Sequence, residues 1–493
     1  MRRLFLSITA LFLLLSFKIT AEPLEVDVIV IGSGLAGHAS VYSALEQGAN
    51  VLWIEKNQVL GGSTAIATGT FAAAETNLQK ERGISDSNEL FIQDINRIGH
   101  QKADQNILRT FVEKAKGVWE WFVSAGLPVD TKRGPFIDPV HSPYSVPRTY
   151  VPTPNTSKQY IEVLFKKIQT YNENLTILLN TKAEHLVVEN GRVRGVLTIS
   201  DKGTKVYKSK AVILATGGYG SNREMIQEYS PKYKEVMTVT LPFATGDGHR
   251  MAKEVGAQLV NMDYICAYFG GIPKGPEQYT IGFGDLTSGA ADGWKGEIWV
   301  NKRGSRFVNE DDPDEDPRET ALNEQPDIES VIIFDQGMVE FNKRYPIANF
   351  EKRLIENSYA VKKADSLEEL CNAFGLPFSQ VKREIDAVNA DFAAGTADRF
   401  GKKPALAFSK GPYYGILNRG VIFMTQGGIK TDIGMRVLDN KGQWIPGLYA
   451  AGEVQGTSQW GGYGLAGGTG TAPPLVFGME AGKNAANEAK LIK

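Results

Sequence analysis

The sequence predicts an α/β fold in which a parallel sheet is interrupted by an inserted second unit. Over residues 26–55 a strand, a glycine-rich turn, a helix and a second strand follow one another. Two later apolar segments, 212–218 and 448–453, are typical of buried strands that stop at small residues. From about residue 260 to 424 the composition becomes aromatic and loop-rich, and strands and glycines then return. The chain therefore predicts one α/β domain made of two separated parts.

The first motif contains every part of a dinucleotide-binding βαβ unit. Residues 26–31 are apolar and rich in β-branched side chains, and they run into Gly32-Ser33-Gly34-Leu35-Ala36-Gly37. A helical pattern follows, and the second strand ends at Glu55. The glycines allow backbone to approach a pyrophosphate at a helix N-terminus, while Glu55 can accept hydrogen bonds from a ribose diol. We therefore predict dinucleotide binding at this turn.

Two other glycine motifs predict different structures. Asn190-Gly191 lies between two alternating apolar segments and predicts a tight β-hairpin turn. Residues 462–467 repeat the Gly-x-Gly-x-x-Gly spacing, but no apolar strand precedes them. We therefore expect no second dinucleotide site there.

Composition and charge indicate a globular protein that does not bind nucleic acid. The 54 Lys and Arg nearly balance the 56 Asp and Glu, so no net field attracts a polyanion. Cys266 and Cys371 are the only cysteines, which excludes a disulfide framework and a Cys-x-x-Cys-His haem attachment site. Two free buried thiols are the simpler expectation, and a single disulfide is the alternative. The five histidines lack metal-ligand spacing, so no metal site is expected.

The N-terminus has the features of a secretory signal. Arg2 and Arg3 precede an apolar run at residues 4–17, and Ala21 stands at a suitable cleavage point. The run is shorter than the roughly 20 residues that cross a bilayer as a helix. We therefore expect removal of residues 1–21, export to the periplasm and no stable membrane insertion afterwards. An uncleaved anchor is the alternative.

An ordered set of motifs resembles one family of flavoproteins. Besides the βαβ unit, the set comprises Gly61-Gly62-Ser63-Thr64, Ala215-Thr216-Gly217-Gly218, Ala244-Thr245-Gly246-Asp247-Gly248, Gly304-Ser305-Arg306-Phe307-Val308-Asn309-Glu310, Ile445-Pro446-Gly447-Leu448-Tyr449-Ala450-Ala451-Gly452-Glu453 and Phe477-Gly478. With these motifs the chain resembles the family of soluble fumarate reductases, urocanate reductase, succinate dehydrogenase flavoproteins and 3-ketosteroid dehydrogenases. The resemblance covers nearly all of the sequence after residue 21.

The resemblance implies a discontinuous Rossmann-type FAD-binding domain with an inserted α+β capping domain. The implied boundaries are 22–264 and 425–493 for the FAD-binding domain and 265–424 for the capping domain. Membrane-bound members attach FAD covalently through a histidine after the glycine-rich turn; Ser63-Thr64-Ala65 stands here, so non-covalent FAD is implied. The residues implied to bind FAD are Gly32, Gly34, Leu35, Ala36, Glu55, Lys56, Gly62, Ser63, Thr64, Gly69, Ala183, Ala215, Thr216, Gly217, Asp247, Glu453, Gly470 and Thr471.

The family chemistry requires a protein group that exchanges a proton with the substrate. Members reduce, or introduce, a carbon–carbon double bond beside an electron-withdrawing group, with hydride passing between flavin and substrate. In fumarate reductases the arginine of a Gly-x-Arg-Phe-x-Asn-Glu segment is the proton donor, which implies Arg306 here. A guanidinium is a weak acid, so Arg306 would need reprotonation or would act mainly as a cation. A structural ion pair with Glu310 or Asp311 is the alternative.

The rest of the fumarate site is missing from this sequence. Phe423-Met424-Thr425 stands where those enzymes carry His-His-Thr, residues 463–468 lack their arginine, and Tyr268 replaces a histidine. Each lost charge-assisted bond to a dicarboxylate is worth about 1.5 to 3 kcal/mol. Fumarate and succinate are therefore poor candidate substrates.

Aromatic and polar residues take the place of that clamp. Tyr463 and Gly467 resemble the Tyr-x-x-x-Gly of ketosteroid dehydrogenases, in which a hydroxyl and a backbone N–H hold a keto oxygen. Tyr463 and Tyr268 join Arg306 as candidate catalytic residues. The candidate substrate-binding residues are Arg148, Thr425 and Gly467.

Two of these expectations have structural alternatives. Arg148 lies in a loop that the family places near the flavin, where it would meet a monocarboxylate; a surface arginine is its alternative. The acidic segment 310–316 is expected to be a solvated loop, with docking of a basic cytochrome as the alternative.

The sequence thus predicts an exported FAD-dependent oxidoreductase that reduces the activated C=C bond of a small unsaturated acid or ketone. Electrons are expected from a separate carrier such as a c-type cytochrome, because no haem motif is present. One alternative is a dehydrogenase that introduces a C=C bond next to a ketone. Another is a flavin electron-transfer protein without turnover of its own.

Overall fold

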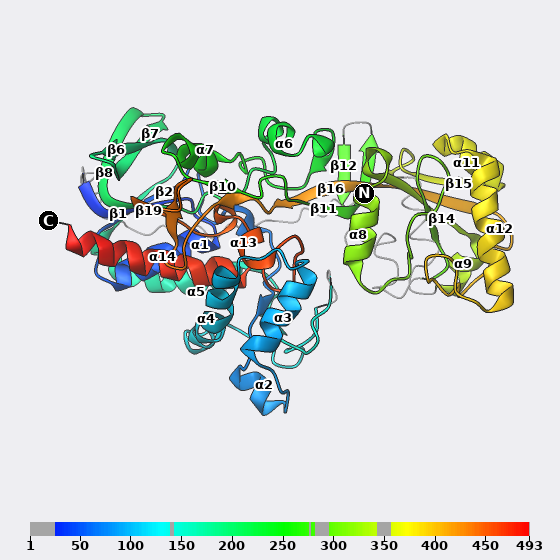
Figure 1. Ribbon diagram of the computed structural model, residues 1–493, viewed down its shortest axis with the longest axis horizontal. Helices are drawn as coiled ribbons and strands as arrows, with labels where there is room; N and C mark the ends of the chain where they lie inside the picture. The colour runs from blue at the N-terminus through cyan, green and yellow to red at the C-terminus, as the bar shows by residue number, and fades with distance from the viewer. Residues whose placement is uncertain (1–24, 139–141, 276–277, 282–294, 343–355, 493) are drawn as a thin grey trace, which may run out of the picture.

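The computed structural model describes residues 25–138, 142–275, 278–281, 295–342 and 356–492 (Figure 1). The predicted signal at 1–21 lies outside these residues. Within them, no helix combines the length and apolarity that crossing a bilayer requires.

A mostly parallel sheet forms the centre of the first domain. Its strand order is β18-β19-β8-β1-β2-β5, with β6 and β7 continuing beside β8. Strands β19, β8, β1, β2 and β5 are mutually parallel, and they come from both ends of the chain. The strands are β1 (Glu25–Ile31), β2 (Val51–Ile54), β5 (Leu175–Leu178), β6 (Lys182–Glu189), β7 (Arg192–Ser200), β8 (Gly203–Leu214), β18 (Arg436–Leu438) and β19 (Trp444–Ala450). The domain is therefore discontinuous, as expected.

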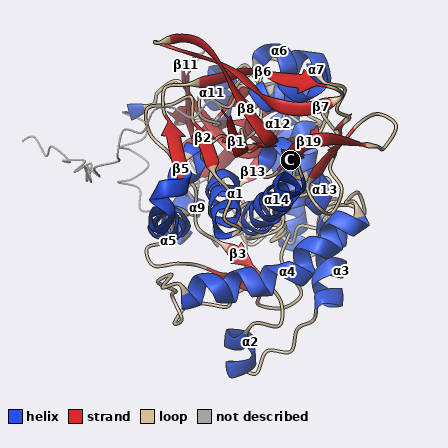
Figure 2. Cartoon of the chain, turned by 90° about the vertical axis from the view of Figure 1, so that its left-hand side faces the viewer, coloured by secondary structure: helices blue, strands red, loops and turns tan. Residues whose placement is uncertain are grey.

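Helices cover one face of this sheet, and the β6–β7 hairpin and α7 lie on the other (Figure 2). Helices α1 and α14 run side by side against the buried strands. The two backbones touch, because a Cβ on Gly482 would lie 2.2 Å from the carbonyl oxygen of Ser40. The helices of this domain are α1 (Leu35–Glu46), α2 (Asn77–Glu81), α3 (Asn88–Ile98), α4 (Gln105–Ser124), α5 (Lys158–Ile168), α6 (Arg223–Tyr229), α7 (Asp247–Glu254), α13 (Ser458–Gly461) and α14 (Ala472–Leu491).

The inserted domain is α+β, with a sheet in the order β12-β11-β16-β14-β13 and its own apolar core. It lies at the β14 end of the molecule in Figure 1. Strand β9 also pairs with β16, so the chain joins this sheet before residue 265, earlier than the expected boundary. The elements are β9 (Met237–Thr238), β11 (Ile265–Gly275), β12 (Gln278–Ile281), β13 (Ile298–Val300), α8 (Glu315–Asn323), β14 (Glu329–Asp335), α9 (Gln336–Phe341), β15 (Val361–Ala364), α11 (Leu367–Phe374), α12 (Phe378–Ala394) and β16 (Tyr413–Thr425).

Short two-stranded pairs complete the fold: β3 (Phe71–Ala72) with β4 (Thr149–Tyr150), and β10 (Leu259–Val260) with β17 (Gly428–Ile429). The hairpin turn is confirmed, since Asn190 and Gly191 have φ angles of 52° and 75°. Helix α13, not a strand, precedes residues 462–467, and Gly462 packs against the carbonyl oxygen of Gly99. These glycines therefore allow close packing onto the end of α3.

Candidate active site

A deep pocket opens at the carboxyl ends of the parallel strands. Residues that follow β1, β2, β8 and β19 line it, which is where open α/β sheets bind ligands. It encloses about 1120 Å³ of space free of atoms, part of it open to solvent. Its lining runs from Glu55 past the turn after β1 to Glu453, an elongated arrangement that suits an extended ligand such as a dinucleotide.

The glycine-rich turn after β1 forms the floor of the pocket. Gly32 has a φ of +100°, and a Cβ there would lie 2.3 Å from the carbonyl oxygen of Ala215, so no other residue fits. Gly34 caps α1 without a side-chain hydrogen bond. The N-terminus of α1 is therefore suited to an anionic group. Thr64 borders this point, and its hydroxyl accepts a hydrogen bond of 3.1 Å from the Leu35 N–H.

Glu55 marks one end of the pocket. Its carboxylate is buried and accepts hydrogen bonds from the Ser33 hydroxyl at 2.5 Å and the Asn57 N–H at 2.8 Å. These bonds fix the carboxylate at the carboxyl end of β2, where it can receive a ribose diol. Beside it, Lys56 forms an ion pair of 2.7 Å with Asp247, which holds α7 against the same rim.

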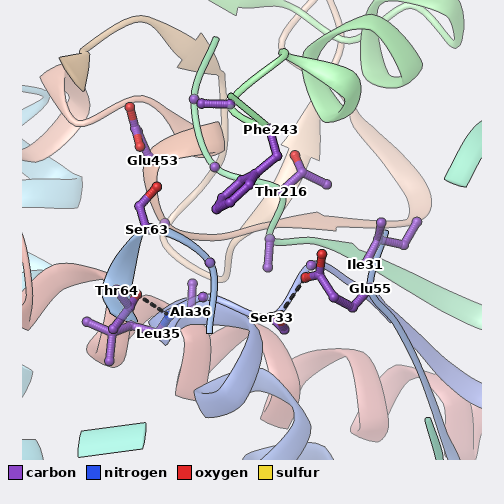
Figure 3. A pocket seen from close by; sticks show the side chains of 18 of the residues that line it. Ile31, Ser33, Leu35, Ala36, Glu55, Ser63, Thr64, Thr216, Phe243 and Glu453 are labelled. Carbon is purple, nitrogen blue, oxygen red and sulfur yellow. Dashed lines mark hydrogen bonds between the residues drawn. The ribbon is translucent and has the colours of Figure 1, made fainter. Parts of the chain in front are cut away.

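Glu453 lies at another part of the pocket, beyond Ser63 and away from Glu55 (Figure 3). Burial raises the pKa of this carboxyl, whereas hydrogen bonds from the Thr425 N–H and hydroxyl, both 3.1 Å, lower it. Thr216 also lines the pocket, and its buried hydroxyl has no hydrogen-bond partner in the described part of the chain. Figure 3 shows the Phe243 ring beside Thr216 in the same space.

Most residues predicted to bind FAD line this one pocket. Gly69 and Thr471 do not: Gly69 packs on Pro152, and the Thr471 hydroxyl lies 3.5 Å from that of Ser157, which is itself a lining residue. The predicted residues that line it are Gly32, Gly34, Leu35, Ala36, Glu55, Lys56, Gly62, Ser63, Thr64, Ala183, Ala215, Thr216, Gly217, Asp247, Glu453 and Gly470. Sequence reasoning missed Phe243, Met251 and Pro474, which carry no local signal.

Within the described part of the chain, Arg306 is not one of the residues that line this pocket. Its guanidinium donates to both carboxylate oxygens of Glu310, at 2.8 and 2.7 Å, and pairs with Asp398 at 2.7 Å. Its side chain is only 1% exposed. Burial lowers the pKa of Arg306, but the two carboxylates raise it by more, so the proton is held tightly. This geometry favours the structural alternative over proton donation.

Arg148 is also a buried structural residue, which corrects the expectation that it meets a substrate carboxylate. It is fully buried and pairs with Asp86 and Asp94, each at 2.7 Å. Its guanidinium further packs over the rings of Phe91 and Tyr144. Because two carboxylates pair with its guanidinium and two rings pack over it, Arg148 has no free face for a ligand.

Tyr463 lies where the two domains meet. Its ring packs edge-on against Tyr264 at 5.0 Å and against His100 at 6.1 Å, and the fully buried Tyr233 adjoins it. Burial raises the pKa of Tyr463, while the neighbouring Tyr233 hydroxyl lowers it. We call Tyr233, Tyr264 and Tyr463 the tyrosine cluster.

Hydrogen bonds connect the tyrosine cluster to the Glu453 part of the pocket. Gln426, which follows Thr425 in the chain, donates two of them: its N–H donates to the Tyr264 carbonyl and its side-chain amide to the Tyr463 carbonyl. The Thr425 hydroxyl in turn donates a hydrogen bond to the Glu453 carboxylate. Gly467 is more distant from this contact, since its carbonyl accepts from the Tyr144 hydroxyl and its Cα packs on Asp138.

The acidic segment 310–316 is a solvated loop only in part: Pro313 is exposed and Asp312 is half-buried, but other members of the segment are enclosed. Glu310 and Glu315 are buried, and Glu315 accepts a 2.6 Å hydrogen bond from the Tyr268 hydroxyl. Asp316 forms an ion pair of 3.0 Å with His100 of the first domain. The Ser142 hydroxyl of the first domain also donates to Asp314, at 2.6 Å. The segment therefore lies at the contact between the two domains.

The fold and pocket together define an FAD-dependent oxidoreductase. The glycine turn at α1, Glu55, Glu453 and the unpartnered Thr216 hydroxyl fit the pyrophosphate and hydroxyl groups of an extended dinucleotide. Comparison identifies the family: residues 27–469 match the FAD binding domain family, and the chain belongs to it. Cys266 and Cys371 are free.

Relatives of the chain are FAD-dependent reductases of C=C bonds. The urocanate reductase of Eggerthella lenta is 32% identical, over 94% of this chain and 75% of its own. A flavocytochrome c3 fumarate reductase in its open conformation aligns with a TM-score of 0.75 and 30% identity, covering 95% of this chain and 79% of that one. The 3-ketosteroid-Δ4-(5α)-dehydrogenase of Rhodococcus jostii has a TM-score of 0.73 and 25% identity, covering 96% and 99%. The chain therefore acts on a CH–CH or C=C bond.

Proposed function

We propose that this protein reduces the activated C=C bond of a small unsaturated acid or ketone other than fumarate, with Tyr463 as the proton donor. The observation that carries the proposal is the position of Tyr463: it is half-buried at the domain contact and linked through Gln426 and Thr425 to the Glu453 part of the cofactor pocket. When bound, FAD supplies the hydride.

Tyr463 suits proton donation better than Arg306. Burial keeps its pKa above the ordinary tyrosine value, so it is protonated at neutral pH, whereas the Tyr233 hydroxyl stabilises its anion. A protonated phenol can give up its proton and be reprotonated from solvent. The adjacent His100 is partly exposed and paired with Asp316, and it offers a route for that proton.

Export and the electron source belong to the same proposal. The N-terminal sequence supports secretion to the periplasm. Electrons then come from a separate carrier, such as a c-type cytochrome; the flavocytochrome likeness supports this partner. Detection of the mature protein, without residues 1–21, in a periplasmic fraction would support export, and an uncleaved cytoplasmic product would contradict it.

A dehydrogenase running in the opposite direction is the second candidate. The likeness to a ketosteroid dehydrogenase and the Tyr463-x-x-x-Gly467 spacing favour it. Dye-coupled oxidation of saturated ketones tests this direction, and dye-driven reduction of enoates and enones tests the first. If neither assay gives turnover and only a partner protein reduces or reoxidises the flavin, the protein is an electron-transfer flavoprotein.

The role of Tyr463 is tested by Tyr463→Phe. We expect FAD to stay bound and turnover to fall by about two or more orders of magnitude, the usual effect of losing a general acid. Tyr359→Phe is the matched control, because that tyrosine is 38% exposed in the inserted domain. Unchanged turnover of the Tyr463→Phe protein would show that the acid is another group.

A further inference from the structure

Two buried aromatic rings hold the glycine turn after β1. Trp53 of β2 donates a hydrogen bond from Nε1 to the Gly32 carbonyl oxygen at 2.9 Å. His38 of α1 bonds the Gly34 carbonyl oxygen through Nδ1 at 3.2 Å. Both side chains are fully buried, and within the described part of the chain neither lines the cofactor pocket, whereas both glycines do. The two rings therefore contact the turn and not the pocket.

The two rings also fix each other. Their centroids lie 4.6 Å apart with an interplanar angle of 89°, and Phe165 of α5 packs edge-on against His38 at 6.5 Å. Burial lowers the pKa of His38 from 6.5 to about 4, although hydrogen bonding to the backbone of Gly34 and Ser33 opposes the shift. The ring is therefore neutral at pH 7 and carries one N–H. A carbonyl can only accept, so this proton is on Nδ1.

The bond from His38 fixes the peptide group between Gly34 and Leu35. This peptide is trans, because the cis bonds of the described residues all precede prolines, so its C=O and N–H point in opposite directions. The carbonyl accepts from the backbone N–H and the ring of His38. The Leu35 N–H donates to the hydroxyl of Thr64, which lines the pocket (Figure 3). The carbonyl oxygen is therefore held away from the side on which Thr64 lies.

The Gly32 carbonyl is held in a similar way. A Cβ on Gly37 would lie 2.1 Å from this oxygen, so the oxygen packs on the backbone of α1. Trp53 supplies the donor that a buried carbonyl needs, and the Gly32 N–H donates to the Ile54 carbonyl of β2 at 2.9 Å. Because the next peptide is also trans, the Ser33 N–H points away from Trp53.

We propose that Trp53 and His38 are positioning residues for the pyrophosphate of the cofactor. Phosphate oxygens accept hydrogen bonds from backbone N–H groups and are repelled by carbonyl oxygens. The ring N–H groups keep the two glycine carbonyls turned away, so that N–H groups of the turn face the phosphates. Each ring acts through a carbonyl and does not touch the cofactor. The inference concerns cofactor binding and is independent of the substrate and of the direction of the proposed reaction.

Displacement of FAD from the holoenzyme by ADP and by adenosine tests this role. ADP carries the diphosphate and adenosine lacks it, and both displace the same FAD, which is measured in the filtrate after ultrafiltration. The ratio of the half-displacing concentrations of adenosine and ADP therefore reports what the phosphates contribute to binding. Trp53→Phe keeps a ring and removes the N–H donor. We expect this ratio to fall about tenfold, the effect of losing one hydrogen bond.

His38→Asn and His38→Leu form a matched pair for the second bond. The amide nitrogen of asparagine can take the place of Nδ1, whereas leucine has no donor but fills the apolar space better. We expect the ratio to stay within about twofold of the wild-type value in His38→Asn and to fall about tenfold in His38→Leu. A role in packing alone predicts the opposite order, and that result would overturn the inference for His38.

Trp119→Phe is the control for the loss of a buried indole. Trp119 packs against Phe71 and Tyr150 in the core and does not line the pocket, so its variant should keep the wild-type ratio. A merely structural role of Trp53 would weaken the binding of ADP and adenosine equally. An unchanged ratio in Trp53→Phe, whatever its melting temperature, would therefore overturn the inference for Trp53.

Discussion

Burial and ion pairing determine whether a charged side chain of this protein is available to a ligand. Arg306 and Arg148 both have sequence neighbours typical of a ligand site, but each is enclosed and matched by two carboxylates. Such a cation is committed to structure, because removing either partner leaves an uncompensated buried charge. Tyr463, which carries no charge, remains half-buried at the domain contact.

Arg306→Ala is expected to lower stability and not chemistry. Glu310 and Asp398 would lose their common partner, at a cost of about 3 to 5 kcal/mol. Thermal unfolding of the FAD-loaded protein measures the loss, and turnover per flavin should stay unchanged. Arg303→Ala, an exposed position three residues away, should change stability by less than about 0.5 kcal/mol. A hundredfold fall in turnover at unchanged stability would restore Arg306 as the proton donor.

Glu297 is expected to make the stability pH-dependent. It is fully buried, neither carboxylate oxygen has a hydrogen-bond partner among the described residues, and burial raises its pKa from 4.5 to about 8. Between these values the folded state keeps a proton that the unfolded state has lost, so the contribution of Glu297 to stability falls as pH rises. The slope is about 1.4 kcal/mol per pH unit.

Urea unfolding of the wild type and Glu297→Gln between pH 5 and 8 measures this contribution. The neutral amide cannot titrate, so the wild type should lose stability relative to the variant as pH rises. Glu324→Gln supplies the exposed control. Parallel pH profiles for wild type and Glu297→Gln would show that Glu297 is already ionised in the folded protein.

Secondary-structure elements position the pocket through close backbone contacts. Helices α1 and α14 approach at Gly478 and Gly482, where Cβ atoms would lie 2.6 and 2.2 Å from carbonyl oxygens of α1. Because α1 carries the glycine turn at its N-terminus, displacement of α14 shifts the floor of the pocket. The acidic segment 310–316 also positions side chains through its local structure. It leads into the N-terminus of α8 and so brings carboxylates to the domain contact.

Gly482→Ala is expected to destabilise the protein and weaken FAD binding. The added methyl group would clash with the backbone of α1 at Ser40 and push the helices apart, at about 1 to 3 kcal/mol. Gly117→Ala in α4 is the control, because a Cβ there meets nothing within 4 Å and should stabilise the helix by about 1 kcal/mol. Equal melting temperatures for the two variants would refute the close contact.

At the scale of the whole molecule, one cofactor joins distant parts of the chain. The pocket is lined by residues from 31 to 474, so FAD binding stabilises the folded state of both separated parts of its domain. No histidine lines this pocket within the described residues. We therefore expect the holoprotein to hold FAD through non-covalent contacts.

The purified protein is expected to be yellow and to release all its flavin on acid precipitation. Free FAD at about 100 times its Kd should stabilise the apoprotein by about 2.7 kcal/mol, visible as a higher melting temperature. Glu55→Ala should reduce this gain, since it removes the acceptor for the ribose diol. Flavin that stays in the acid pellet would contradict non-covalent binding.

Four features could be predicted from the sequence: the βαβ unit, the hairpin at Asn190-Gly191, the discontinuous domain and most of the FAD pocket. The βαβ unit and the hairpin depend on local spacing, because a strand, a glycine turn and an acid lie close together in the chain. The discontinuous domain and the further FAD-binding residues were implied by the family resemblance. Local spacing also predicted that no strand precedes residues 462–467, and α13 precedes them in the structure.

Only the packing of distant segments shows which polar residues are structural and which lie at the contact between the domains. The partners of Arg306 and Arg148 include Asp398 and Asp86, 92 and 62 positions away, and no local pattern reveals such pairings. Tyr233, Tyr463 and the acids of α8 come from three distant segments that meet only when the inserted domain packs on the first. Burial and long-range pairing arise from that packing, and they determine the charge state and availability of a side chain.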